Sequence, residues 1–370
     1  MTLNFSSTIR FTAAFTGLLA LTAAIGCVGC GGHGVALPSM TSVLDKALWV
    51  ANGANVVEFI PSQLTTGTAD PAPHLAINSS VFGAPQGVAF DADGNLWVID
   101  GGTVAAGGTI APALFQFSAA QLANLATVDN PAPAITIRSA SFTFPQQAVF
   151  DGKGNLWVSD NGANAVFVFA PGQLQATSAK AAPSISVTSS TAFNGPLGIA
   201  FDANGNLYVA NNAGTTIERF SAGSLPTSAG THKIAPNQVL QDDGAGSIQA
   251  PWGLAFDAEG DLWSSNANAP NTLVEFTPAQ LATGGNPTPA VTLKSVAVAG
   301  SQSLVAPNGI AFDNLGGIAA ASSAAPFGIA AFPKTQLVPA NAGEAPKAFL
   351  VGNTTTLNAP AGVAFGPVVQ

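Results

Sequence analysis

The chain has 370 residues, of which 8% are charged, and its 10 Lys and Arg against 19 Asp and Glu give a formal net charge of −9. Nucleic-acid binding depends on clustered basic side chains that neutralise phosphates, so this balance excludes DNA and RNA as expected ligands. Both cysteines, Cys27 and Cys30, lie near the start, which excludes a disulfide framework and thiol catalysis in the rest of the chain.

Residues 1–26 are predicted to be a signal peptide. Arg10 precedes an apolar segment, residues 11–25, that is too short for a comfortable membrane span and typical of a signal-peptide core. Small residues stand directly before Cys27, which resembles the cleavage motif of bacterial lipoproteins and predicts a lipid-anchored Cys27. Cys30 is a second candidate, and an ordinary secretory signal with incidental cysteines is the alternative. We therefore expect export, either as a cell-envelope lipoprotein on the outer-membrane or periplasmic side or as a secreted protein.

Residues 27–42 are rich in Gly and predict a flexible tether. His33 lies in it and is interpreted as part of the spacer. Residues 43–370 then form the single folded domain. Its acidic balance disfavours anionic membrane surfaces, so we expect membrane contact only through the N-terminal lipid and a monomer in solution.

One motif organises the domain. It first appears complete as PQGVAFDADGNLWVID, beginning at Pro85, and its copies begin at Pro145, Pro196, Pro251, Pro307 and Pro360, at spacings of 60, 51, 55, 56 and 53 residues. A fixed period of this length indicates an array or propeller of small units. The apolar run of each copy predicts a first strand, and the Asp-to-Gly-Asn stretch predicts a tight hairpin turn.

The rest of each repeat predicts three more strands. The second strand carries a central aromatic residue, and the third ends in Phe, followed shortly by Leu and usually by the pair Gln-Leu. The aromatic positions are Trp49, Trp97, Trp157, Tyr208 and Trp263, and the Phe positions are Phe59, Phe117, Phe169, Phe220, Phe276 and Phe332. A Pro-containing loop then leads to a fourth apolar run, such as residues 134–137. Four strands per repeat are typical of a β-propeller blade.

The two ends of the domain predict six blades. Residues 44–59 contain a second and a third strand but no first, whereas residues 360–365 contain a first strand alone. Together they complete one blade, and this pairing would close the ring and remove its exposed sheet edges. The predicted fold is therefore an all-β, six-bladed β-propeller of four-stranded antiparallel blades.

The repeat resembles the NHL repeat, and the chain after residue 43 resembles the six-bladed propellers of bacterial NHL-repeat proteins, with a looser similarity to the SMP-30/gluconolactonase group. The first resemblance implies a binding module, since propellers of this kind host many functions. The second would imply a lactonase or related hydrolase that holds Ca²⁺ or another divalent cation at acidic and amide residues.

The candidate site lies where the loops between strands two and three and the loops into strand one meet, at the mouth of the central channel. The candidate ligand-binding residues are Asp100, Asp160, Asn211, Asn266, Gln86, Gln146, Trp252 and Asn308. Asp and Asn could bind a sugar, a peptide or a cation there, but at strand ends they also shape turns, and their recurrence in every blade favours the structural interpretation. Trp252 departs from the repeat, and it could either stack on a ligand or plug the channel.

Catalytic and metal-binding sets are not apparent in the sequence. Only Asn308 matches a cation ligand expected after the proline that opens each copy, and Asp91 to Asn95 resemble a calcium loop that lacks its later Glu. The streptogramin lyases, another family of propeller enzymes, would require a catalytic histidine, but His74 and His232 are predicted in loops on the opposite face. We therefore predict no catalytic residues, no metal and no cofactor.

The leading hypothesis is a non-catalytic binding or protein-interaction module at the cell envelope, whose ligand is a protein, a peptide or a glycan. The alternative is a metal-dependent hydrolase at the channel mouth that uses Asp100, Asp160 and Asn308. A third hypothesis is a scaffold that binds an envelope protein through the Pro-rich loops of the opposite face.

Overall fold

The computed structural model describes residues 45–64, 67–105, 108–191, 193–341 and 343–369. The chain divides into two compact units, residues 1–41 and 42–370, and every described residue belongs to the second unit. The predicted signal peptide, its Cys27 and most of the tether lie outside the described residues. Among the helices of the described part, none is long and apolar enough to cross a membrane.

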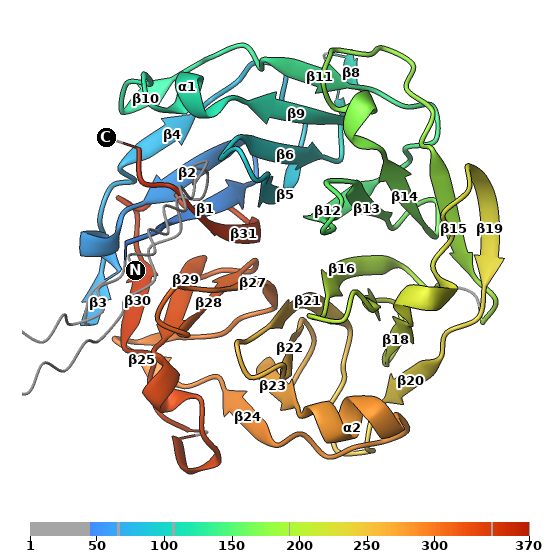
Figure 1. The fold of residues 1–370 in the computed structure, drawn as a ribbon. Coiled ribbons are helices and arrows are strands. Elements are labelled where there is room, and N and C mark those ends of the chain that lie inside the picture. The colour runs from blue at the N-terminus through green and yellow to red at the C-terminus, as the bar shows by residue number, and fades with distance from the viewer. Residues whose placement is uncertain (1–44, 65–66, 106–107, 192, 342, 370) are drawn as a thin grey trace, which may run out of the picture. The chain divides into compact units, whose positions relative to one another are not determined.

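Six sheets of four or five strands surround one axis, which confirms the predicted six-bladed β-propeller (Figure 1). From the innermost strand outward, blade 1 consists of β31 (Pro360–Gly366), β1 (Ala47–Asn52), β2 (Asn55–Phe59) and β4 (Leu75–Ile77). Blade 2 consists of β5 (Pro85–Phe90), β6 (Leu96–Asp100), β9 (Ala113–Phe117) and β11 (Ile135–Ile137). Blade 3 consists of β12 (Pro145–Phe150), β13 (Leu156–Asp160), β14 (Ala165–Phe169) and β15 (Ile185–Ser189). Blade 4 consists of β16 (Pro196–Phe201), β17 (Leu207–Asn211), β18 (Thr216–Phe220) and β20 (Gln238–Gln241). Blade 5 consists of β21 (Pro251–Phe256), β22 (Leu262–Asn266), β23 (Thr272–Phe276) and β24 (Val291–Lys294). Blade 6 consists of β27 (Pro307–Phe312), β28 (Ile318–Ser322), β29 (Gly328–Phe332) and β30 (Ala348–Val351).

Blade 1 is assembled from both ends of the domain. Strand β31 pairs antiparallel with β1, so that Phe365 lies opposite Leu48 and Ala364 lies opposite Trp49. This confirms the predicted ring closure, and Figure 1 shows the red C-terminal strand beside the blue N-terminal ones. Because β31 covers the inner edge of β1, blade 1 has an innermost strand as the other five blades do.

The hairpin turn of each repeat is held by its Asp. In blade 2, Asp91 Oδ1 accepts the backbone amides of Asp93 and Asn95, at 3.1 and 2.9 Å. Asp91 Oδ2 accepts Asn95 Nδ2 and Trp97 Nε1, and Gly94 supplies the positive φ of 77° that the turn needs. The stretch that resembles a calcium loop is therefore a turn whose leading carboxylate already accepts four hydrogen bonds.

The repeated aromatic residues form the contacts between blades. The ring on the second strand of one blade packs edge-on against the Phe at the end of the first strand of the next blade, with centroid distances from 5.1 to 6.3 Å. The pairs are Trp49–Phe90, Trp97–Phe150, Trp157–Phe201, Tyr208–Phe256 and Trp263–Phe312. The aromatic position of the second strand and the Phe position of the first strand thus meet across five of the six blade boundaries.

The Gln of the Gln-Leu pairs closes a short helical turn after the third strand. In blade 2, this turn is α1 (Ala119–Leu122), where Ser118 and Gln121 form a capping box. The Gln121 amide also donates to the Ala132 carbonyl of the Pro-containing loop, at 3.0 Å. The corresponding turns are η1 (Pro61–Gln63), η2 (Pro171–Gln173), η3 (Ala222–Ser224), α2 (Pro278–Thr283) and η4 (Lys334–Gln336), with η5 (Pro339–Asn341) following the last.

The outer rim differs from the predicted four strands. The connection between the third and fourth strands of one blade reaches back and pairs in parallel with the outer strand of the preceding blade. Strands β3 (Gly67–Ala69), β10 (Val128–Asp129) and β19 (Gly230–Ile234) pair in this way with β30, β4 and β15, and two isolated bridges repeat the arrangement between blades 2 and 3 and between blades 4 and 5. His232 therefore lies in strand β19 and not in a loop as predicted. Two small hairpins, β7 (Thr103–Ala105) with β8 (Gly108–Ile110) and β25 (Ala297–Val298) with β26 (Ser301–Gln302), complete the strands.

Candidate functional site

The predicted ring of Asp and Asn lies at the mouth end of the second strands, as the sequence indicated. Asp100 ends β6 and is fully buried. Its carboxylate accepts the backbone amides of Gly83, Ala84 and Gly102, at 2.9, 3.2 and 2.7 Å. Burial raises the pKa of Asp100, and these three amide donors oppose the rise. The carboxylate is directed into the loop that leads to strand one of its own blade.

The equivalent residues of the other blades behave in the same way. Asp160 is fully buried and accepts the amides of Thr143, Phe144 and Ala163. Asn211 accepts the Asn194 amide, and Asn266 accepts the Gln249 amide at 2.8 Å. These contacts are the turn-shaping role that the sequence analysis favoured on the grounds of recurrence.

Trp252 lies over the centre of the channel mouth. It comes from β21 of blade 5, is 6% exposed, and packs in one cluster with Leu197 of blade 4 and Ala361 of blade 1. Because blades 4 and 1 stand on opposite sides of the ring, a cluster that joins residues of both extends across the mouth. This position matches the plug that the sequence analysis gave as one of two roles for Trp252.

The remaining mouth residues surround this plug. Gln86 is half-buried, and its Nε2 donates to the Ala84 carbonyl at 3.3 Å. Gln146 is buried, and among the described residues its Nε2 has no hydrogen-bond partner. Asn308 is half-buried, and its backbone carbonyl accepts the hydroxyl of Ser265. Among the described mouth residues, the amide nitrogen of Gln146 is therefore the one buried side-chain polar atom left without a hydrogen bond.

The two histidines of the domain lie away from the mouth. His74 precedes β4, and its Nδ1 lies 2.8 Å from Glu58 Oε2. Burial raises the pKa of Glu58, while His74 and the Val369 amide lower it. His232 Nε2 lies 2.9 Å from the Ser228 carbonyl on the rim. Within the described residues, no three His, Cys, Asp or Glu side chains are grouped so that they could hold a metal ion.

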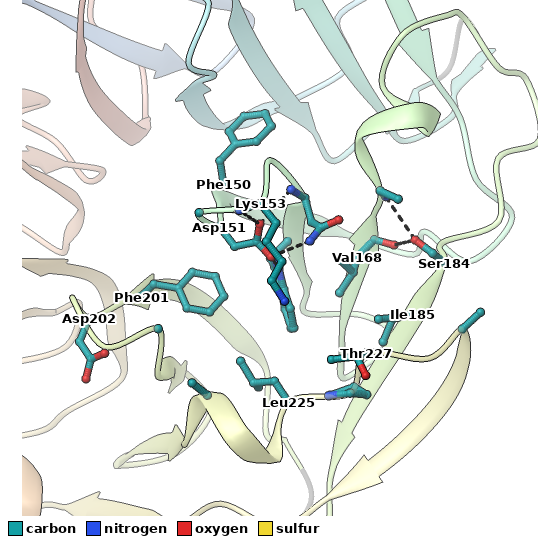
Figure 2. Close-up of a pocket in the computed structure, with 18 of the residues that line it drawn as sticks. Phe150, Asp151, Lys153, Val168, Ser184, Ile185, Phe201, Asp202, Leu225 and Thr227 are labelled. Carbon is teal, nitrogen blue, oxygen red and sulfur yellow. Dashed lines mark hydrogen bonds between the residues drawn. The ribbon is translucent and has the colours of Figure 1, made fainter. Parts of the chain in front are cut away.

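Two open cavities lie between blades on the face opposite the mouth. The larger, with a volume of about 840 Å³, lies between blades 3 and 4 and is called groove 3/4. Its walls include Trp157, Val168 and Ile185 of blade 3 and Phe201 and Leu225 of blade 4. Figure 2 shows Val168, Ile185, Phe201 and Leu225 around the opening, and Lys153 beside them on the turn of blade 3. A second cavity of about 570 Å³, groove 2/3, occupies the equivalent place between blades 2 and 3.

Polar groups in groove 3/4 are mostly engaged. Asp151 accepts Asn155 Nδ2 and Trp157 Nε1 at 2.8 and 2.9 Å, as well as two backbone amides. Burial raises the pKa of Asp151, but these hydrogen bonds outweigh it and hold the pKa below the usual value. Ser184 Oγ bonds to the Val168 carbonyl and to Gln173 Oε1. Asp202, the second carboxylate of the lining, likewise accepts the Asn204 and Asn206 amides and Asn206 Nδ2. The groove thus combines apolar walls with two carboxylates that already accept hydrogen bonds from their own turns.

Sequence reasoning did not find these grooves, although the repeat contained the signal. The same turn, aromatic and Phe positions line both cavities, and these positions had been interpreted as structural. The open space between these residues could not be predicted from the sequence, because its size depends on the distance between neighbouring blades.

The fold defines the class of this protein as a six-bladed β-propeller. No family model matches the chain, and no curated protein matches it. The resemblance to NHL repeats therefore remains a prediction.

Several solved structures are similar to this chain in fold. A candidate 6-phosphogluconolactonase from Bacteroides fragilis is similar with a TM-score of 0.54 and 13% identity, covering 89% of this chain and 99% of that one. A protein of unknown function from Bacteroides caccae has a TM-score of 0.54 and 10% identity, covering 87% and 99%. Virginiamycin B lyase from Staphylococcus aureus is similar over 70% of this chain and 69% of that one, with a TM-score of 0.43 and 14% identity. Identities this low show the fold alone.

Proposed function

We propose that this protein is a non-catalytic binding module, exported and held at the cell envelope through Cys27, with groove 3/4 as its ligand site. The observation that carries the proposal is an open cavity of about 840 Å³ with apolar walls, a size that falls within the range of ligand sites. It lies on the face that the third hypothesis from the sequence assigned to interactions. The ligand site therefore moves from the channel mouth to the opposite face.

The chemistry of the carboxylates supports binding over catalysis. A general acid or base needs a titratable group that can reach the substrate and exchange a proton. Asp151, in the groove, accepts four hydrogen bonds from its own turn. Asp100 and Asp160, which the hydrolase alternative requires, each accept three backbone amides of their own blade already.

Groove 3/4 can be tested by nuclear magnetic resonance of the tryptophan indole N–H groups. The chain has five Trp residues, and Trp157, in the wall of the groove, is assigned by the loss of its signal in Trp157→Phe. Three probes are titrated into the full chain: a capped apolar hexapeptide, decanoate and N,N′-diacetylchitobiose. We expect at least one probe to shift the Trp157 signal saturably. The proposal fails if all three leave Trp157 unchanged at millimolar concentration.

Membrane anchoring is a separate test of localisation. In a bacterial host, the wild-type chain should fractionate with membranes and be released only by detergent, because an acyl chain contributes about 0.8 kcal/mol per buried CH₂. Cys27→Ser should appear in the soluble fraction, while Cys30→Ser should fractionate as the wild type does. Equal release of wild type and Cys27→Ser would contradict the anchor.

A further inference from the structure

We propose that groove 3/4 binds a short, extended, apolar peptide segment, in the way that the chain's own residues 366–369 lie in the corresponding groove between blades 1 and 2. The inference rests on the function proposed above and specifies its ligand. Its basis is a comparison of quasi-equivalent sites within one molecule.

The two grooves are built from the same repeat positions. Trp49 of β1 and Trp157 of β13 hold the same position in the repeat, and each packs against the Phe that ends the first strand of the next blade. Glu58 and Val168 stand directly before the Phe that ends β2 and β14. Further matched pairs are Leu75 with Ile185, Phe90 with Phe201, and Leu122 with Leu225. A segment that fits one groove therefore meets similar walls in the other.

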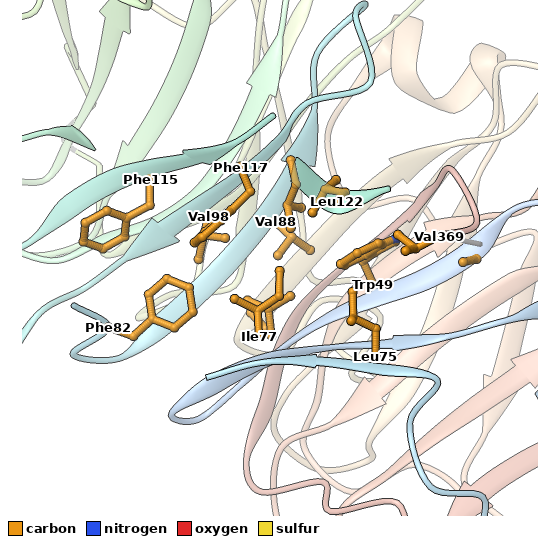
Figure 3. Packing of buried hydrophobic residues seen from close by; sticks show 14 of the residues in the cluster. Trp49, Leu75, Ile77, Phe82, Val88, Val98, Phe115, Phe117, Leu122 and Val369 are labelled. Carbon is orange, nitrogen blue, oxygen red and sulfur yellow. The ribbon is translucent and has the colours of Figure 1, made fainter. Parts of the chain in front are cut away.

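In the groove between blades 1 and 2, the occupant is visible. The Pro367 carbonyl accepts Trp49 Nε1 at 3.1 Å, so it replaces the turn Asp that binds this N–H in other blades. The chain then runs outward, and the Val369 amide donates to Glu58 Oε1 at 2.9 Å. The Val369 side chain is 6% exposed and belongs to the same hydrophobic cluster as Trp49 and Leu75, as Figure 3 shows.

Groove 3/4 has no such occupant because its strands are joined. In blade 3, the first strand turns back through residues 151–155 into the second strand, so nothing continues over the third strand. Val168 also replaces Glu58, which makes the floor more apolar. The space that Val369 fills between blades 1 and 2 is thus open between blades 3 and 4.

These walls suit a peptide better than a sugar. A sugar needs several hydrogen-bonding groups around its hydroxyls, but Trp157 Nε1 is already bonded to Asp151. Both carboxylates of the lining, Asp151 and Asp202, accept hydrogen bonds from their own turns. Between them the lining presents the apolar side chains of Val168, Ile185 and Leu225. A peptide with small branched side chains can bury them there while its backbone stays near the solvated rim. Lys153, which is not part of either ion pair formed by the described residues, can hydrogen-bond a peptide carbonyl at that rim.

The experiment uses the segment that the molecule itself shows. The capped hexapeptide Ala-Phe-Gly-Pro-Val-Val, which copies residues 364–369, is titrated into the ¹⁵N-labelled full chain. We expect a saturable shift of the Trp157 indole signal with a Kd between about 0.1 and 5 mM, a range reasonable for so short a ligand. The Trp263 signal, which reports on blades 5 and 6, should not move.

A matched pair of variants locates the binding. Ala203 and Ala258 are exposed and hold the same turn position in blades 4 and 5, but only Ala203 lines groove 3/4. Ala203→Phe should weaken the hexapeptide at least fivefold, whereas Ala258→Phe should bind it as the wild type does. Equal binding by both variants overturns the inference, as does a shift confined to Trp49, which would mean that the peptide displaces the chain's own segment.

The outcomes also separate this inference from the proposed function. If decanoate or diacetylchitobiose shifts Trp157 and the hexapeptide does not, the groove is a ligand site and the peptide inference is wrong. If no probe shifts Trp157, both are wrong.

Discussion

Asp and Asn residues at the mouth-side ends of the second strands act through their side-chain oxygens. In blades 2 and 3 the residue is Asp, and in blades 1, 4 and 5 it is Asn52, Asn211 or Asn266, yet each accepts a backbone amide from the loop that leads into strand one. Since either residue supplies an acceptor oxygen, the interchange within one chain indicates that the negative charge is not what the position requires.

Asp100 allows a test of this role. Asp100→Ala would remove the acceptor of the buried Gly102 amide and of the part-buried Gly83 and Ala84 amides. An amide that water cannot reach costs about 1–3 kcal/mol when it is unpaired, so we expect a loss of about 2–3 kcal/mol in the free energy of unfolding. Asp100→Asn keeps an acceptor and should lose less than half as much. Urea denaturation followed by tryptophan fluorescence measures both. Equal losses would show that the charge itself is required.

Glu275 is the carboxyl group whose protonation the fold alters near neutral pH. Burial, followed by the nearby negative charges of Asp261, Asp257 and Glu259, raises the pKa of Glu275 to about 7. Between about pH 4.5 and pH 7, the folded chain therefore holds a proton that the unfolded chain has released. The stabilisation is complete at low pH and is lost as the pH rises through 7.

Glu275→Gln should remove this pH dependence. We expect the wild type to lose about 1 kcal/mol between pH 5.5 and pH 8 from this group, after allowance for solvent screening, and the variant to lose less over the same range. Denaturation midpoints at four pH values give the comparison, with the exposed Glu344→Gln as control. Parallel curves for wild type and Glu275→Gln would contradict the raised pKa.

At the scale of elements, the segment after β31 seals blade 1. Removing residues 367–370 would take the Val369 side chain out of the hydrophobic cluster and expose Trp49 to solvent. It would also break two hydrogen bonds, from Trp49 Nε1 to the Pro367 carbonyl and from the Val369 amide to Glu58 Oε1. Burial of a Val contributes about 1.5 kcal/mol or more, and each hydrogen bond about 1 kcal/mol, so the expected loss is roughly 3 kcal/mol.

The same truncation has a site-specific readout. The Trp49 indole signal should move strongly while the Trp263 signal stays in place, and thermal unfolding should begin at a lower temperature. Removal of Gln370 alone serves as the control. A truncated chain with wild-type stability would mean that the segment only lies on the surface.

The strands, the turns and the blade count could be predicted because each depends on residues that recur. Pro85, Asp91 and Trp97 mark a strand, a turn and a second strand in one blade, and the same spacing returns along the chain. The parallel pairing of β19 with β15 could not be predicted, because Gly230 to Ile234 share no pattern with the other connections. The grooves were missed for a related reason. Val168 and Glu58 hold equivalent positions in two different repeats, but only the contacts between neighbouring blades decide whether the space beside each residue is filled.

At the scale of the whole molecule, glycines on the innermost strands allow the blades to approach. A Cβ on Gly198 would lie 2.1 Å from the Trp252 carbonyl oxygen, and one on Gly253 would lie 2.5 Å from that of Asn308. Gly87, Gly309 and Gly362 stand in the same relation to the next blade. The ring closes at this radius because five of its six innermost strands lack a side chain there.

Gly198→Ala should therefore weaken the whole ring. We expect a loss of about 2–3 kcal/mol or more, since backbone on both sides must shift. Gly223→Ala is the matched control, because a Cβ there meets nothing within 4 Å, and its stability should stay within about 0.5 kcal/mol of wild type. Differential scanning calorimetry compares the two. Similar unfolding temperatures for both variants would contradict the close approach of the strands.

The composition of blade 1 from β31 and β1 has a consequence for biosynthesis. Trp49 and Pro367 are joined by a hydrogen bond across 318 positions of sequence, whereas the other blades form within single repeats. A ribosome adds about 5–20 residues per second, so the other five blades can begin to form before β31, the partner of β1, has been synthesised. During that interval the apolar inner side of β1 has no native cover, so newly made chains are most exposed to chaperones and to misassembly at this one sheet.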